Sequence, residues 1–273
     1  MPSDTISALI PHYGFSPTSN RWLSQCIRSL LEQTTPLDRV IVVDDVSPCP
    51  PEDTVRAFPE VSLYRNSHNT GPFTMIDRVF ADIDSDYILL QDSDDWSSPD
   101  RLELLLSGMR NWQTDVIGCQ VSAVSAVGDP LESAPDQLPS DPRAALVENP
   151  LAHPVILPST LVSCEFARRI GGLSTGLRFG ADSEFARRAC LGGKVRNISE
   201  TAYVRRMHPG SLTQSPATGF GSAARLEVQK MVQDHARSLV ASFREDGPLD
   251  LSPQWRSTPA HLEHVLGPPV PGL

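Results

Sequence analysis

Acidic side chains gather in the segment Gln91-Asp92-Ser93-Asp94-Asp95-Trp96, directly after the apolar run Tyr87-Ile88-Leu89-Leu90. Three carboxylates within four residues repel one another, and a hard divalent cation such as Mg²⁺ or Mn²⁺ would relieve that repulsion. The apolar run predicts a buried strand, and the end of a strand is where open α/β sheets bind their ligands. The segment therefore predicts a metal site, with a solvated acidic turn that caps the next helix as the alternative.

A second acidic pair, Asp44-Asp45, follows the β-branched run Val40-Ile41-Val42-Val43. That run predicts another buried strand. A carboxylate at its end can accept hydrogen bonds from a nucleobase N–H or from a ribose hydroxyl. Bacterial receiver domains also carry paired aspartates after an apolar strand, but at their extreme N-terminus. Here a whole strand-helix unit comes first, which disfavours that class.

Strand-like and helix-like patterns alternate through the first half of the chain and would position these acids. Short apolar runs predict strands, and apolar residues at helical spacing predict helices. The predicted strands lie at 5–10, 40–43, 61–64 and 87–90, and the predicted helices at 21–33, 72–83 and 99–109. This alternation predicts an α/β fold with a mostly parallel central sheet flanked by helices.

The second half of the chain is less regular. Prolines concentrate around 130–158 and after 247. The segment 122–158 is interpreted as a loop-like insertion, because turn-forming residues interrupt every pattern in it. Patterned sequence then resumes, with a returning strand predicted at 195–204 and an amphipathic helix at 222–244.

Composition excludes several classes of protein. The chain has 273 residues and a formal net charge of −10, the wrong sign for broad attraction to nucleic acid. Its five cysteines lie far apart without CxxC spacing, so neither a zinc site nor a disulfide framework is predicted. The first residues lack a signal-peptide pattern, and no apolar run approaches the ~18 residues of a membrane span. We therefore expect a cytoplasmic protein with no transmembrane segment.

Several motifs, in order along the chain, resemble those of the family 2 glycosyltransferases of the GT-A fold. The resemblance runs from Ile6 to Gln214. The motifs are Ile6–Tyr13 (first strand and nucleotide loop), Ser29–Thr34 (end of the first helix), Val42–Asp45 (the strand that reads the base), Asn69-Thr70-Gly71 (an Asn-x-Gly turn), Leu90–Asp95 (the DXD motif), Gly180–Glu184 (the segment of the acceptor-side base) and Arg206–Thr213 (a closing loop whose His can reach the metal).

The resemblance implies an inverting transfer of a sugar from a nucleotide-diphosphate donor, most readily a UDP-sugar, to an acceptor hydroxyl. It implies Mn²⁺ or Mg²⁺ as the cofactor, held by Asp94, Asp92 and His208. Asp182 would be the catalytic base, and Glu184, the other residue assigned to catalysis, would orient loops or contact the acceptor. Because Ala181 stands where the family usually has another acid, the base could shift towards Glu184. The residues that would bind the donor are Pro11, Tyr13, Asp44, Asp45, Asn69, Asp92 and Ser93.

The resemblance also predicts how the chain is divided. A glycosyltransferase domain would span 1–214, with a donor half over about 1–120 and an acceptor half over about 121–214. A C-terminal helix and a Pro-rich tail would follow over 215–273, and this helix could support a homodimer. One departure concerns the diphosphate, because Ile76-Asp77 replaces the Arg-Asn pair that commonly follows the Asn-x-Gly turn.

The acceptor and two other functions stay open at this point. The acceptor could be a glycan, a metabolite or another hydroxyl-bearing molecule, and a nucleic-acid acceptor is not excluded. A noncatalytic nucleotide-sugar or glycan binder would keep the pocket and lose metal or base residues. A sugar-nucleotide pyrophosphorylase should open with a Gly-rich, Arg-containing loop, which the segment 11–15 is not. Dehydrogenases are excluded because no GxGxxG follows a strand.

Overall fold

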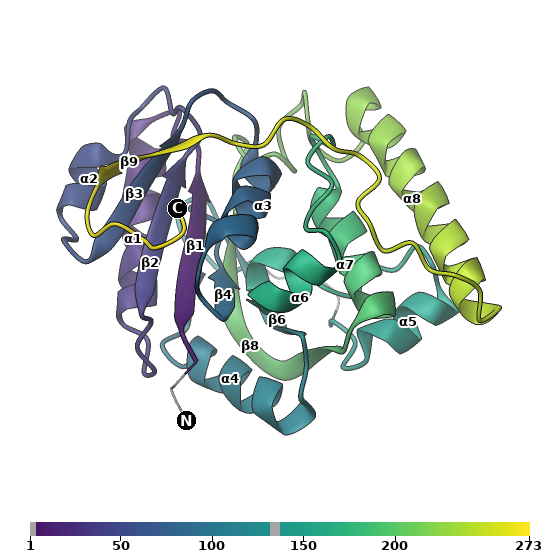
Figure 1. The fold of residues 1–273 in the computed structure, drawn as a ribbon. Coiled ribbons are helices and arrows are strands. Elements are labelled where there is room, and N and C mark those ends of the chain that lie inside the picture. The colour runs from purple at the N-terminus through teal and green to yellow at the C-terminus, as the bar shows by residue number, and fades with distance from the viewer. Residues whose placement is uncertain (1–3, 132–136) are drawn as a thin grey trace.

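One continuous sheet runs through the protein and separates two layers of helices (Figure 1). The computed structural model describes residues 4–131 and 137–273. Nine strands in these residues follow the spatial order β5-β8-β6-β7-β4-β1-β2-β3-β9. The strands are β1 (Ile6–His12), β2 (Arg39–Asp44), β3 (Val61–Asn66), β4 (Tyr87–Leu90), β5 (Trp96–Ser97), β6 (Val116–Ser125), β7 (Thr160–Ser163), β8 (Val195–Met207) and β9 (Leu262–Leu266).

Helices connect most of these strands. They are α1 (Pro17–Leu31), α2 (Glu52–Arg56), α3 (Pro72–Asp82), α4 (Arg101–Trp112), α5 (Pro142–Glu148), α6 (Cys164–Arg169), α7 (Ala181–Gly192) and α8 (Ala223–Arg244), with a short 3₁₀ helix, η1 (Leu157–Ser159). The start of α1 illustrates how local residues begin a helix. Ser16 caps α1 by accepting a hydrogen bond from the backbone N–H of Ser19, and Pro17 fits the first turn.

The predicted α/β fold is confirmed, but the sheet is mixed instead of mostly parallel, and its main parallel part lies in the N-terminal half. Strands β4, β1, β2 and β3 are neighbours and all run parallel. In the C-terminal half β6 and β8 are parallel, whereas β7 pairs antiparallel with both β4 and β6. The carboxyl ends of β1, β2 and β4 therefore meet at one edge, where a doubly wound sheet binds its ligands.

Each face of the sheet has its own hydrophobic core. One core joins the sheet to α1, α2 and α4 through residues such as Ile27, Val55 and Leu105. The other joins it to α3, α6, α7 and α8 through residues such as Phe80, Phe166, Phe185 and Leu239. These strands are buried on both faces, which is why they read as continuous apolar runs.

The C-terminal segment returns to the central sheet. Helix α8 agrees with the helix predicted at 222–244, and the segment after it crosses the molecule to β9 (Figure 1). Strand β9 pairs antiparallel with β3, and beyond it Val270 donates its N–H to the hydroxyl of Tyr64 over 2.8 Å. The sequence predicts only a Pro-rich tail here. The structure shows instead that its last part covers an otherwise unpaired edge.

The segment 122–158 contains more structure than the predicted insertion. Strand β6 continues to Ser125, α5 occupies 142–148, and η1 begins at Leu157, near the end of this segment. Residues 132–136 lie outside the described residues. Across the described ranges, no helix combines the length and the apolar character needed to cross a membrane.

Candidate active site

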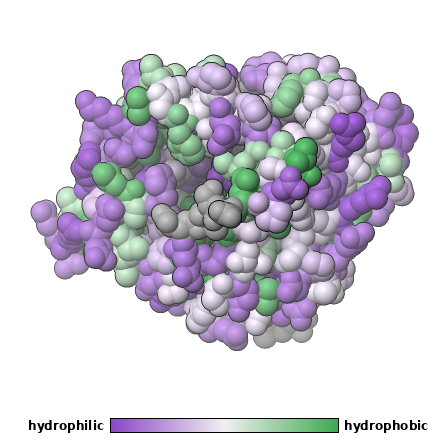
Figure 2. All heavy atoms as spheres, turned by 180° about the vertical axis from the view of Figure 1, so that it is seen from behind, coloured by the Kyte–Doolittle hydropathy of each residue, from purple (hydrophilic) through white to green (hydrophobic). Residues whose placement is uncertain are grey.

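A cavity of about 800 Å³ opens at the carboxyl ends of β1 and β4 and is closed on its far side by α7 and α8. Figure 2 shows the face opposite to that of Figure 1, where hydrophobic side chains interrupt a mainly hydrophilic surface. Four exposed hydrophobic residues line the cavity: Tyr13, Phe15, Leu212 and Phe220. The cavity therefore combines apolar walls with the charged groups described below, as ligand sites commonly do.

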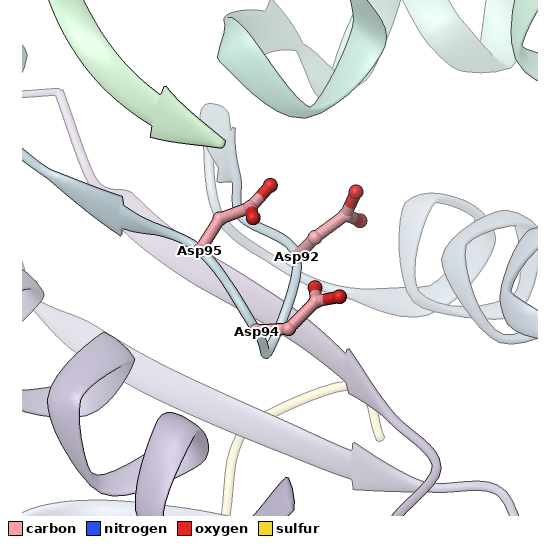
Figure 3. Close-up of side chains that lie close together, drawn as sticks. All are labelled: Asp92, Asp94 and Asp95. Carbon is pink, nitrogen blue, oxygen red and sulfur yellow. The ribbon is translucent and has the colours of Figure 1, made fainter. Parts of the chain in front are cut away.

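The acidic segment after β4 enters this cavity. Asp92, Asp94 and Asp95 place one carboxylate oxygen each within 4.8 Å of the others. In Figure 3, Asp92 and Asp94 point to one side of the loop, and Asp95 lies next to the end of β8. Burial, together with the charge of Asp94, raises the pKa of Asp92 to about 7. The carboxylates that the sequence predicts to repel one another thus lie close together in the structure.

Asp95 anchors the loop. Its two carboxylate oxygens accept hydrogen bonds from the hydroxyl of Tyr203 and from the backbone N–H of Arg206, each over 2.7 Å. Its side chain is buried, and burial raises the pKa of its carboxyl group well above the ordinary value. Because both of its oxygens are engaged, Asp95 fixes the loop and leaves Asp92 and Asp94 to face the cavity.

Arg206 holds the same loop from β8. Its Nε donates to the carbonyl oxygen of Asp94 over 3.0 Å, and another guanidinium nitrogen donates to the side chain of Gln25. The guanidinium lies over the rings of Trp22 and Trp96, at 5.2 Å and 4.8 Å from their centroids. These contacts fix the Asp94 backbone and occupy the guanidinium.

His208 reaches the acidic cluster from the loop after β8. Its Nε2 lies 2.7 Å from Oδ2 of Asp94, and its ring is 4.5 Å from that of Trp22. The structure therefore brings together Asp92, Asp94 and His208, the residues assigned to the metal from the sequence. Carboxylate oxygens and an imidazole nitrogen suit Mn²⁺, and the carboxylates suit Mg²⁺.

The two aspartates after the apolar run of β2, Asp44 and Asp45, lie in different environments. Asp45 lines the cavity, and its carboxylate accepts hydrogen bonds from the backbone N–H groups of Thr70 and Gly71. Burial raises the pKa of Asp45. Asp44 is fully buried and lies outside the cavity wall, where it accepts from Nε of Arg65 over 2.8 Å.

Of the other residues predicted to bind the donor, some line the cavity and one lies outside it. Pro11, Tyr13 and Ser93 line the cavity, and Tyr13 is 47% exposed. Asn69 is exposed, and its amide donates to the backbone carbonyl of Asp45 over 3.0 Å. Asn69 therefore supports the position of Asp45 from outside the cavity.

Asp182 lies on the opposite wall, in the first turn of α7. Gly180 starts this helix with a φ of 76°, a conformation that glycine adopts without strain. The Asp182 side chain lines the cavity and acts electrostatically on Asp92, whose pKa it helps to raise. One cavity thus holds the acidic cluster on one wall and a single carboxylate on the other.

Glu184 lies elsewhere. Its two carboxylate oxygens accept from Nε and a terminal nitrogen of Arg188 over 2.5 and 2.8 Å, and both side chains are fully buried. Arg188 also donates to the carbonyls of Ile170, Gly172 and Leu251. Glu184 is absent from the cavity wall, so the structure joins it to a buried ion pair and leaves Asp182 as the acid that faces the cavity.

Replacing Glu184 with glutamine is expected to lower the free energy of unfolding by about 3 kcal/mol, because it leaves the Arg188 guanidinium buried without its counter-charge. Urea unfolding measures this loss. The exposed pair Asp234–Arg237 gives the control, since Asp234→Asn should change stability by less than about 1 kcal/mol. A Glu184→Gln protein of unchanged stability and no transferase activity would contradict this structural assignment.

Sequence reasoning missed several residues of the cavity wall. His12 lies between the predicted Pro11 and Tyr13, is 1% exposed, and contacts Asn20 through its Nε2. Arginines also line the wall: Arg178, Arg187, Arg205, Arg206 and Arg225. A basic residue next to a site motif was the available signal for Arg205 and Arg206. Nothing local marks Arg225, which arrives on α8.

Comparisons with known proteins show what this chain is similar to. A stretch of 116 residues is 26% identical to the glycosyltransferase GlyA of Streptococcus pneumoniae serotype 4, covering 41% of this chain and 16% of GlyA. Crystal structures of S. aureus TarS residues 1–349 are also similar. The complex with UDP is 15% identical with a TM-score of 0.59, covering 89% of this chain and 73% of that chain. The complex with UDP-GlcNAc is 15% identical with a TM-score of 0.62, covering 88% and 71%.

The structural likeness confirms the predicted GT-A type of fold. The family itself is shown by a sequence model. The model described as glycosyl transferase family 2 matches residues 7–171, which include nearly all of β1, strands β2 to β4, the acidic cluster and strands β5 to β7. Since this match covers more than half of the chain, the chain belongs to glycosyl transferase family 2.

Proposed function

We propose that this protein is a metal-dependent, inverting glycosyltransferase that moves a sugar from a UDP-sugar to an acceptor hydroxyl. The observation that carries this proposal is the arrangement of acids in one cavity. Asp92 and Asp94 lie on the wall at the end of β4, and Asp182 faces them from α7. Such an arrangement can stabilise a leaving group on one side of a sugar and activate a nucleophile on the other.

The wall at β1 and β2 binds the nucleoside. Tyr13 offers a partly exposed aromatic ring, and Pro11 lies beside it. Asp45, held by Thr70 and Gly71, presents a fixed carboxylate that accepts from a base N–H or a ribose hydroxyl. UDP is the preferred nucleotide because the structurally similar TarS is bound to UDP and to UDP-GlcNAc in its crystal structures.

The acidic cluster holds Mn²⁺ or Mg²⁺ through Asp94 and Asp92, with His208 as a further ligand. The donor set fits such an ion, since carboxylates this close together repel one another, and burial raises the pKa of Asp92 to about 7. When bound, the ion offsets the negative charge that develops on the departing diphosphate. Arg206 and Asp95 keep the ligand loop in place for this purpose.

Asp182 acts as the general base. It removes the proton of the acceptor hydroxyl as that oxygen attacks the anomeric carbon, and the C–O bond to the diphosphate breaks on the opposite side. Attack and departure on opposite faces invert the anomeric centre. Glu184 has no part in this step, because Arg188 occupies its carboxylate in the core.

Binding of a nucleotide-sugar with metal tests the proposal directly. Thermal unfolding is measured with UDP-, dTDP-, GDP- and ADP-sugars, each with and without Mn²⁺. A UDP-sugar at 100 times its Kd is expected to stabilise the protein by about 2.7 kcal/mol, and only when Mn²⁺ is present. Mn²⁺ without nucleotide is the matched control. Absence of a shift with every nucleotide contradicts the proposal, and a shift confined to another nucleotide contradicts the assignment of UDP.

A further inference from the structure

Five arginines line the cavity: Arg178, Arg187, Arg205, Arg206 and Arg225. Within the described ranges, none of them forms an ion pair with a carboxylate, whereas nine arginines outside the cavity do. The chain as a whole carries a net charge of −10. Five aspartates line the same cavity, but none of them forms a direct ion pair with these arginines in the described ranges, so the guanidinium groups can still attract an anionic ligand.

The arginines fall into two groups by their neighbours. Arg205 and Arg206 come from β8 and act on the acidic cluster, since Arg205 lowers the pKa of Asp92 and Arg206 binds the Asp94 backbone. For Arg187 and Arg225, Asp182 is the carboxylate that acts most strongly on the pKa of each guanidinium. Arg187 lies on α7, the helix of Asp182, and Arg225 lies on α8, so both belong to the wall that faces the acidic cluster.

Arg225 is held rigidly at this wall. Its Nε donates to the carbonyl oxygen of Thr218 over 2.6 Å, and a terminal nitrogen donates to that of Leu212 over 2.7 Å. Its guanidinium lies 4.7 Å from the ring of Phe179 and 5.1 Å from that of Phe220. An arginine fixed in this way loses little conformational freedom when it binds an anion.

Arg187 is more deeply buried. It is 2% exposed and donates to the carbonyls of Ser183, Leu151 and Ala152, while its buried Nε has no partner among the described residues. Burying a charged group without a counter-ion is costly. Arg178, three residues before the start of α7, adds an exposed guanidinium to the same wall.

We infer that the acceptor carries an anionic group, a phosphate or a carboxylate, close to its reacting hydroxyl, and that Arg178, Arg187 and Arg225 bind this group beside Asp182. This inference rests on the proposed function and specifies the acceptor class. The donor diphosphate is served at the other wall by the metal ligands and Arg205. The arginines beside the base therefore remain for the acceptor, and they attract an anion that the rest of the acidic surface repels.

Calorimetry on the UDP- and Mn²⁺-saturated protein tests the inference without any need for turnover, since bound UDP occupies the donor phosphate site. The probes are glucose, glucose 6-phosphate and glucuronate. We expect at least one of the two anions to bind at least tenfold more tightly than glucose, and the two anionic probes separate a phosphate from a carboxylate preference. The doubly substituted Arg178→Gln, Arg225→Gln protein is expected to reduce that advantage to under threefold.

Arg237→Gln is the matched control, because Arg237 lies on the same helix as Arg225 and is exposed and paired with Asp234. It should keep the full preference for the anion, and Arg225→Lys should keep part of it. Equal binding of glucose and both anions, no binding of either anion, or an advantage that survives the double substitution would overturn the inference. Failure of UDP itself to bind would instead overturn the proposed function, so the two failures are distinguishable.

Discussion

Replacing Asp182 with asparagine is expected to lower kcat about 10³-fold while leaving the Kd for the UDP-sugar and Mn²⁺ within about twofold of the original. General bases contribute roughly 10² to 10⁴ in rate, and the amide of asparagine cannot take the proton of the acceptor hydroxyl. The donor contacts lie on the other wall, at β1, β2 and the acidic cluster. Binding and turnover should therefore separate in this variant.

Steady-state kinetics and thermal shifts with the UDP-sugar check this result together. Asp234→Asn on α8 is the control, since Asp234 is exposed and pairs with Arg237 on its own helix. If Asp182→Asn keeps full activity, Asp182 is not the general base. The sequence around Ala181 leaves open whether Asp182 or Glu184 is the base. Asp182 is the base if Asp182→Asn loses turnover while a stably folded Glu184→Gln protein keeps it.

The acidic cluster was predictable because its signals are local. An apolar run of four residues defines β4, and the residues after it must emerge at the carboxyl edge of the sheet. The separation of Asp182 from Glu184 was also partly predictable. Residues two apart on a helix point to different sides, and α7 buries Glu184 while Asp182 stays in the cavity.

The roles of Asp44 and Asn69 depended on distant partners and could not be predicted. Asp44 is held by Arg65, which comes from the neighbouring strand β3, and that register exists only once the sheet has formed. Asn69 belongs to the turn that closes around Asp45. Their residue types fit donor binding equally well, so the sequence alone could not separate a contact with ligand from a contact with the protein.

Four strands, β5, β6, β7 and β9, escaped sequence analysis, and β6 and β9 show the physical reasons. Strand β6 continues through Gly118, Ser122 and Ser125, and small or polar residues of this kind weaken a strand pattern. Strand β9 is an edge strand, with exposed residues at three of its five positions, so it lacks a buried face to mark it. Both are specified by pairing with strands far away in the chain, β6 with β8 and β9 with β3.

Replacing Asp94 with asparagine is expected to abolish the Mn²⁺-dependent part of UDP-sugar binding and to lower turnover at least 10³-fold. A metal ion contributes several kcal/mol to stabilising a developing charge, and each 1.36 kcal/mol corresponds to about a factor of ten in rate. Asp94 is the central residue of this cluster: its carboxylate contacts His208 over 2.7 Å, and its charge raises the pKa of Asp92.

Asp94→Asn is also expected to affect the stability of the metal-free protein. Asp94 contributes to the repulsion that raises the pKa values of both Asp92 and Asp95, so removing its charge should leave the metal-free protein at least as stable as before. Urea unfolding with and without Mn²⁺ and UDP measures both effects, and Asp53→Asn, at an exposed ion pair on α2, is the control.

A variant that is stable without metal yet unresponsive to Mn²⁺ shows that Asp94 serves the ligand. If Asp94→Asn keeps its full Mn²⁺ response, the ion does not depend on this carboxylate, and the assignment of Asp94 as a metal ligand is wrong.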